Sequence, residues 1–83
     1  MTVVSVIIPT FNREALIQRA LQSVIKQQNV NTEIIVVDDG SSDSTEQVIR
    51  EKFKSVKYLK KNHNGVSSAR NVGIKNASGS FIA

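Results

Sequence analysis

Two adjacent carboxylates follow a run of apolar, β-branched residues near the middle of the chain. Glu33–Val37 predicts a buried strand, and Asp38 and Asp39 come directly after it, before Gly40. Neighbouring strand residues point to opposite faces, so we expect the two carboxylates to have different roles. One would accept hydrogen bonds from nearby backbone, and the other would offer its oxygens to ligand N–H or O–H groups, such as a uracil imide or a ribose hydroxyl. The alternative is that both serve the turn around Gly40.

Two arginines lie at positions where a bound anionic ligand would account for the positive charge. Arg13 falls in the first turn of a predicted helix, where the helix dipole disfavours a cation unless a phosphate binds there. Arg70 falls in another predicted helix, among the small or apolar residues Ala69, Val72 and Gly73. A guanidinium near a packing face needs an anionic partner, and it binds diphosphate in a forked geometry. For Arg13, a side chain that simply points into water is the alternative.

The hydrophobic pattern places these residues on alternating strands and helices. The order strand-helix-strand-helix-strand-helix-strand, with short connections, predicts an α/β fold in three layers: a mainly parallel, Rossmann-like sheet with helices on both faces. Asn12 is placed to cap the first helix, and the second has a capping-box pattern at Ser44 and Gln47, or at Asp43 and Glu46. The expected strands are Val3–Ile8, Glu33–Val37, Lys57–Lys61 and Ser80–Ala83, and the expected helices are Arg13–Gln28, Ser44–Phe53 and Val66–Ala77.

Three polar segments follow the predicted strands at their carboxyl ends. They are Pro9–Asn12, Asp38–Ser41 and His63–Gly65. Open parallel sheets bind ligands outside the carboxyl ends of their strands, so we expect one site at this edge. For His63 itself we favour a solvent-exposed side chain.

Length and composition limit what the chain can be. Its 83 residues, 40% hydrophobic and 22% charged, suit a single globular unit, and a last strand that starts four residues from the end predicts the first half of a larger α/β domain. We therefore treat 1–83 as one partial domain. No apolar run approaches the roughly 18 residues that span a bilayer, and Val3–Ile8 lacks the basic start and the length of a signal peptide. We expect a cytoplasmic location, including the inner face of the membrane.

The net charge of +4 is unevenly distributed along the chain. Residues 1–50 have four basic and six acidic side chains, whereas residues 51–83 have seven basic and one acidic. A basic half suggests an anionic partner such as a phosphate-bearing small molecule, a membrane surface or a nucleic acid. We interpret the lysines themselves as a solvated face and an edge strand. They are Lys52, Lys54, Lys57, Lys60 and Lys61.

Several classes of site lack the residues they require. The chain has no Gly-x-Gly-x-x-Gly after the first strand and no Gly-Lys-Ser/Thr, so neither the dinucleotide fingerprint nor the P-loop is present. It has no cysteine and one histidine, which leaves no cluster for a transition metal. No aromatic-rich strand supports nucleic-acid recognition, so we expect no nucleic-acid partner. A phospho-acceptor receiver domain would place the acidic pair after the first strand and a third aspartate after the third, unlike this chain.

Three motifs occur together in one order along almost the whole chain. They are Val-Ser-Val-Ile-Ile-Pro-Thr-Phe-Asn-Arg (4–13), Val-Val-Asp-Asp-Gly-Ser-Ser-Asp-Ser-Thr (36–45) and Gly-Val-Ser-Ser-Ala-Arg-Asn-Val-Gly-Ile (65–74). The combination resembles the start of a family 2 inverting glycosyltransferase of the GT-A fold, from residue 3 to residue 82. Such an enzyme moves a sugar from a nucleoside-diphosphate donor, most often a UDP-sugar, to an acceptor hydroxyl with inversion.

The resemblance implies a role for each motif in binding the donor. Asp39 matches the carboxylate that binds the base, and Asp38 would help to hold the strand end. Pro9–Asn12 would line the nucleotide pocket, while Gly65 and Arg70 match a motif under the diphosphate. The implied nucleotide-binding residues are Pro9, Thr10, Phe11, Asn12, Arg13, Asp38, Asp39, Gly65 and Arg70.

The resemblance also implies parts that these 83 residues do not contain. The complete enzyme would use Mn²⁺ or Mg²⁺ held by an Asp-x-Asp-type motif after the fourth strand, and an acceptor that is a glycan or a lipid-linked glycan. The metal motif and the catalytic base would come after Ala83, so we expect this chain alone to bind nucleotide at most, with no metal and no catalytic residue of its own. The alternative is a non-catalytic interaction or structural module that self-associates through its incomplete sheet.

Overall fold

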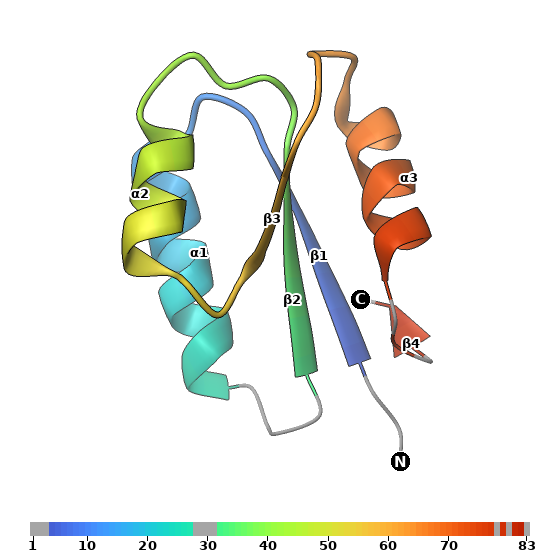
Figure 1. The fold of residues 1–83 in the computed structure, drawn as a ribbon. Coiled ribbons are helices and arrows are strands. Elements are labelled where there is room, and N and C mark those ends of the chain that lie inside the picture. Colours follow the sequence, from blue (N-terminus) through green and yellow to red (C-terminus); the bar gives the residue numbers. More distant parts are fainter. Residues whose placement is uncertain (1–3, 28–31, 78, 80, 83) are drawn as a thin grey trace.

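The computed structural model describes residues 4–27, 32–77, 79 and 81–82 of the chain, which alternate between strands and helices (Figure 1). This order confirms the α/β fold predicted from the hydrophobic pattern. The predicted positions Val3, Gln28, Ser80 and Ala83 lie outside the described residues. The elements are β1 (Val4–Thr10), α1 (Glu14–Gln27), β2 (Thr32–Asp38), α2 (Thr45–Lys52), β3 (Lys57–Lys60), α3 (Val66–Asn76) and β4 (Phe81–Ile82).

The four strands form one parallel sheet in the order β3-β2-β1-β4. The register pairs Thr10 of β1 with Asp38 of β2, and Asp38 with Lys60 of β3. Backbone hydrogen bonds continue just past these pairs, from the N–H of Asp39 to the carbonyl of Thr10 and from the N–H of Lys61 to the carbonyl of Asp38, both at 2.9 Å. The carboxyl ends of three strands therefore meet at one edge of the sheet, as predicted.

Helices cover both faces of the sheet, which gives the three layers expected from the sequence (Figure 1). Alternate side chains of β2 supply the two cores: Ile34 and Val36 pack with residues of α1 and α2, and Ile35 and Val37 pack toward α3. Because both faces of the sheet are covered, side chains on both sides of β2 are apolar, and its residues Ile34–Val37 are a continuous apolar run.

Helix α3 packs unusually close to β1. A Cβ built on Gly73 would lie 2.4 Å from Cγ2 of Ile7, well inside van der Waals contact. Ala69, one turn earlier, is fully buried in the core on this side of the sheet. The small residues of the third motif therefore let α3 lie directly on the strand, and this position fixes where the helix begins at the sheet edge.

The caps predicted at Asn12 and Ser44 are not formed, whereas Asp43 of the alternative register accepts a hydrogen bond from the N–H of Thr45, the first residue of α2, at 3.0 Å. Helix α1 begins at Glu14, and Asn12 has φ 49° and directs its side chain to Ser42 instead of to the helix. Ser44 precedes α2 but makes no side-chain capping bond, so the Ser44–Gln47 capping box is not formed. Asn12 instead joins the loop after β1 to the loop after β2, and the local sequence pattern does not contain this tertiary contact.

Candidate functional site

Asp38 is buried at the end of β2 and is fully engaged in structure. Its Oδ1 accepts a hydrogen bond from the backbone N–H of Ser41 at 2.8 Å, and its Oδ2 accepts one from the hydroxyl of Tyr58 on β3. Burial, together with the hydrogen bond to this carboxylate, raises the pKa of Tyr58. Asp38 thus joins its own loop to the neighbouring strand, the role expected of one member of the pair.

Asp39 points to a different part of the molecule, the loop 61–65 between β3 and α3. Its Oδ1 accepts from Nζ of Lys61 at 2.6 Å and from the N–H of Asn64 at 3.0 Å. Its Oδ2 accepts from the N–H of Gly65 at 2.9 Å and lies 2.9 Å from Nδ1 of His63. The Lys61 ammonium, followed by the N–H groups of Asn64 and Gly65, holds the pKa of Asp39 well below its usual range. Asp39 is therefore an anion seated at the amino end of α3, where the helix dipole favours negative charge.

Gly40 brings the loop after β2 against the loop 61–65. Its φ of +85° lies in the left-handed region, and a Cβ at this position would stand 2.8 Å from the backbone nitrogen of His63. Only glycine fits both the conformation and the contact. The Asp-Asp-Gly order is therefore a geometric requirement, because the two carboxylates diverge and the glycine lets the loops meet.

Asn12 ties the loop after β1 to the loop after β2. Its N–H donates to Oγ of Ser41 at 2.8 Å, and its Oδ1 accepts from the N–H of Ser42 at 2.8 Å. Asparagine tolerates the left-handed conformation that this arrangement needs. Together with the bond from the N–H of Asp39 to the carbonyl of Thr10, these hydrogen bonds join the first and second motifs beyond the paired strands.

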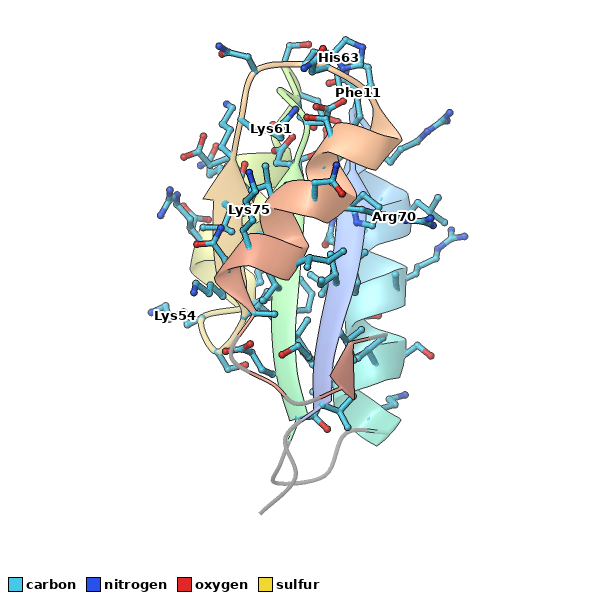
Figure 2. The ribbon with its side chains drawn as sticks, turned by 90° about the vertical axis from the view of Figure 1, so that its right-hand side faces the viewer. Phe11, Lys54, Lys61, His63, Arg70 and Lys75 are labelled. Atoms are coloured by element: carbon cyan, nitrogen blue, oxygen red, sulfur yellow. The ribbon has the colours of Figure 1, made fainter. Side chains whose placement is uncertain are left out.

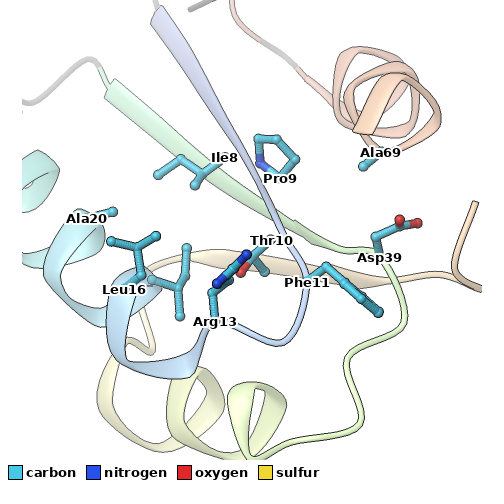
Figure 3. Close-up of a pocket in the computed structure, with 10 residues that line it drawn as sticks. Ile8, Pro9, Thr10, Phe11, Arg13, Leu16, Ala20, Asp39 and Ala69 are labelled. Atoms are coloured by element: carbon cyan, nitrogen blue, oxygen red, sulfur yellow. The ribbon is translucent and has the colours of Figure 1, made fainter. Parts of the chain in front are cut away.

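A pocket of about 350 Å³ opens at the carboxyl end of β1, between α1 and the start of α3 (Figure 3). Apolar side chains form its floor, and Phe11, Arg13 and Asp39 bring an aromatic ring, a guanidinium and a carboxylate to its edge. Leu16 of α1 also faces it and is 60% exposed. The pocket is lined by Ile8, Pro9, Thr10, Phe11, Arg13, Leu16, Ile17, Ala20, Asp39 and Ala69.

The nine predicted nucleotide-binding residues fall into three groups. The first group lines the pocket: Pro9, Thr10, Phe11, Arg13 and Asp39. The second group builds the loops around it through hydrogen bonds: Asn12, Asp38 and Gly65.

The third group is Arg70, which is exposed on α3 one residue after the pocket-lining Ala69. Figure 2 shows its side chain leaving α3 on the side away from Lys75. In the described part of the chain, no carboxylate pairs with it. The anionic partner that we expect for Arg70 is therefore not supplied by the described residues.

Two side chains of the loop 61–65 contact this site, although the sequence predicted only that the segment His63–Gly65 lies at this edge and gave neither side chain a role there. Lys61 was interpreted as a solvated lysine, but its side chain is only 15% exposed and pairs with Asp39. His63 is 60% exposed, as a surface histidine would be, yet its ring also stacks on Phe11 (Figure 2). The available signal was their place after β3, at the same sheet edge as the two aspartates.

The described residues contain no group of three or more His, Cys, Asp or Glu side chains that could hold a metal ion. These described residues therefore offer no binding site for the divalent metal that the family resemblance implies. Among the same residues, no helix is long and apolar enough to cross a membrane.

Comparison with known proteins gives one consistent family. The model for the family described as glycosyl transferase family 2 matches residues 5–83. An uncharacterized glycosyltransferase of Rickettsia conorii is 45% identical over 84 residues, which cover 99% of this chain and 14% of the relative. The chain thus corresponds to a small part of a longer protein of this kind.

Two solved structures resemble the fold over nearly its whole length. The complex of S. aureus TarS 1–349 with UDP-GlcNAc matches with a TM-score of 0.86 at 36% identity, over 96% of this chain and 25% of that one. Glucosyl-3-phosphoglycerate synthase of Mycobacterium tuberculosis, in complex with Mn²⁺, UDP and glucosyl-3-phosphoglycerate, matches with a TM-score of 0.80 at 26% identity. That match covers 98% of this chain and 32% of the synthase. The resemblance noted in the sequence motifs is thereby confirmed.

Proposed function

Since the chain belongs to glycosyl transferase family 2, we propose that it is the nucleotide-binding half of a glycosyltransferase and that the pocket at the end of β1 binds a nucleoside-diphosphate sugar. The donor we propose is uridine-linked. The observation that carries the proposal is that Phe11, Arg13 and Asp39 line one pocket.

These three groups match two of the chemical parts of a nucleotide, the base and the phosphate. The ring of Phe11 is 38% exposed and offers a face on which a base can stack. The ionised carboxylate of Asp39 accepts hydrogen bonds only, so it suits the imide N–H of uracil. Arg13 precedes the first residue of α1, where a phosphate gains both the guanidinium and the helix N-terminus.

Arg70 supports the diphosphate part of this proposal. It is exposed, it has no carboxylate partner in the described part of the chain, and it neighbours Ala69 in the pocket wall. A guanidinium binds phosphate oxygens in a two-pronged geometry that a lysine does not reproduce. Arg13 and Arg70 would then approach the diphosphate from α1 and α3, while the base lies toward Asp39.

For the whole protein we propose sugar transfer to an acceptor hydroxyl with inversion. The mycobacterial neighbour is in complex with Mn²⁺ and UDP, which supports a divalent metal in the complete enzyme. The described residues offer no cluster to hold such a metal. We propose that this chain alone binds the nucleotide and does not transfer the sugar.

Calorimetric titration with UDP, without metal and with Mn²⁺, tests the proposal. We expect UDP to bind the unmodified chain and Asp39→Asn to weaken it about tenfold or more, because a hydrogen bond to a charged group is lost. The matched control is Glu51→Gln, which removes the same charge from an exposed position on α2, away from the pocket.

The folded state of each variant is checked by its ¹H–¹⁵N spectrum. Equal UDP affinity in a folded Asp39→Asn variant would refute the assignment of Asp39. If UDP bound neither the unmodified chain nor the control, the proposed function of this pocket would be wrong.

A further inference from the structure

His63 makes two contacts at the edge of the pocket that a bound base would also need. Its ring stacks on Phe11, with 4.1 Å between the ring centroids and 21° between the planes. Its Nδ1 lies 2.9 Å from Oδ2 of Asp39. Figure 2 shows the two rings together at the carboxyl edge of the sheet. The imidazole ring of His63 therefore covers a face of the Phe11 ring and contacts the carboxylate of Asp39 at the same time.

The neighbours of Nδ1 determine which nitrogen of His63 carries hydrogen. Besides Oδ2 of Asp39, Nδ1 lies 3.1 Å from the carbonyl oxygen of the same residue. Both neighbours are acceptors only, so Nδ1 must be the N–H donor. This is the hydrogen-bonding sense that an imide N–H would have toward Asp39.

The carboxylate of Asp39 already accepts three hydrogen bonds, and the ring of His63 lies against it. An ionised carboxylate offers about four lone-pair sites, two on each oxygen. Oδ1 receives Lys61 and the N–H of Asn64, and Oδ2 receives the N–H of Gly65. Nδ1 of His63 lies 2.9 Å from the same Oδ2. A base that donates to Asp39 must therefore take the place of one of these three donors or of the His63 ring.

His63 is the donor that can leave with least disturbance. The N–H groups of Asn64 and Gly65 belong to the backbone that begins α3. The side chain of Lys61 is 15% exposed and forms a short ion pair of 2.6 Å. The side chain of His63 is 60% exposed, and it can turn into water without moving the backbone.

We propose that the His63 ring occupies the base position in the free protein, and that a nucleotide binds only when its base displaces this ring. This inference rests on the proposed function, because it takes Phe11 and Asp39 as the groups that receive the base. His63 then acts as a specificity residue: a ligand must supply both a flat ring and an N–H donor to replace it. If the ring were in place in nine molecules of ten, the apparent affinity would be about tenfold lower than the intrinsic one.

Uridine and inorganic pyrophosphate are the probes that separate base from phosphate. We expect His63→Ala to bind uridine about tenfold more tightly than the unmodified chain, which corresponds to about 1.4 kcal/mol. Pyrophosphate, which has no base, should bind both with the same affinity. The matched control is Asn62→Ala, the exposed neighbour in the same loop, for which we expect uridine affinity within about twofold of the unmodified chain.

The unmodified chain offers a second readout, because His63 is its single histidine. Stacking on Phe11 should shift its imidazole proton resonances in the free protein, and saturating UDP should move them toward the values of an unstacked histidine. This measurement needs no substitution, so it stands even where a variant folds poorly.

The outcomes separate this inference from the function on which it rests. If UDP binds but the His63 resonances stay in place, or if His63→Ala binds uridine equally or more weakly, the displacement is refuted and nucleotide binding is not. If His63→Ala binds uridine more weakly than the unmodified chain, the His63 ring stabilises the position of Phe11 and does not compete with the base. If UDP and uridine bind no form of the protein, both the inference and the proposed function are wrong.

Discussion

Replacing Gly73 with alanine tests how closely α3 must lie on the sheet. The added Cβ would stand 2.4 Å from Cγ2 of Ile7 and 3.2 Å from its Cγ1 and Cδ1. Carbon atoms in good contact are about 3.5–4.0 Å apart, so helix or strand must shift by roughly 1 Å. The helix carries Ala69 in the pocket wall and starts at the loop that donates to Asp39. A shift of α3 should therefore displace Ala69 in the pocket wall and the loop that donates to Asp39.

Two effects of opposite sign determine how much Gly73→Ala changes the free energy of unfolding. Alanine is favoured over glycine inside a helix by about 0.8–1 kcal/mol. Overpacking a close contact costs typically 1–3 kcal/mol. Because the clash involves a branched carbon next to the strand backbone and not the far end of a flexible chain, we expect the upper part of that range. The net expectation for Gly73→Ala is a loss of about 1–2 kcal/mol in the free energy of unfolding.

Urea unfolding of four proteins measures the effect and its cause. The set is the unmodified chain, Gly73→Ala, Ile7→Ala and the double variant. Ile7→Ala removes the atoms that clash, so the double variant should lose less stability than the two single losses added together. Asn71→Ala, at an exposed position of the same helix, is the control and should be neutral or slightly stabilising.

The affinity for UDP gives the functional half of this test. We expect Gly73→Ala to bind UDP more weakly than the unmodified chain, because displaced α3 no longer brings Ala69 and Gly65 to their places. A Gly73→Ala variant that is as stable as the unmodified chain, with additive losses in the double variant, would refute the close packing of α3 on β1.

Two further predictions concern the aspartate pair. Tyr58→Phe removes the hydroxyl that donates to buried Asp38, so we expect a loss of about 1.5–3 kcal/mol in urea unfolding; a change below about 0.5 kcal/mol would contradict this role. The pKa of Asp39 is lowered in the folded state, chiefly by Lys61. Its contribution to stability should therefore be complete above the unfolded pKa of about 3.9 and decline as the pH falls below it. Asp39→Asn should flatten this part of the stability curve, and an unchanged slope between about pH 4 and pH 2 would exclude the assignment.

Much of the fold could be predicted because the signals for it are local. The β-branched run of β2, buried on both faces, and the helical spacing of Ile17 and Leu21 in α1 each specify an element from its own residues. The alternation of strands and helices then leaves few topologies, since crossovers are right-handed and connections are short. The capping prediction for Asn12 failed because this residue lies where two loops meet, and its partner Ser42 is 30 residues away in the sequence. Ser44 makes no capping bond, and Asp43 accepts from the first N–H of α2 instead.

The sequence alone determined the α/β class, the parallel sheet edge at which the polar segments gather, and the opposite directions of the Asp38 and Asp39 side chains, because strand geometry and motif order are properties of short segments. Only the tertiary structure decided that the side chains of Lys61 and His63 lie against the carboxylate of Asp39, 22 and 24 residues away along the chain. The physical reason is that an exposed loop residue has no periodic signal of its own. Its partners are set by where the folded sheet and the turn at Gly40 place the loop.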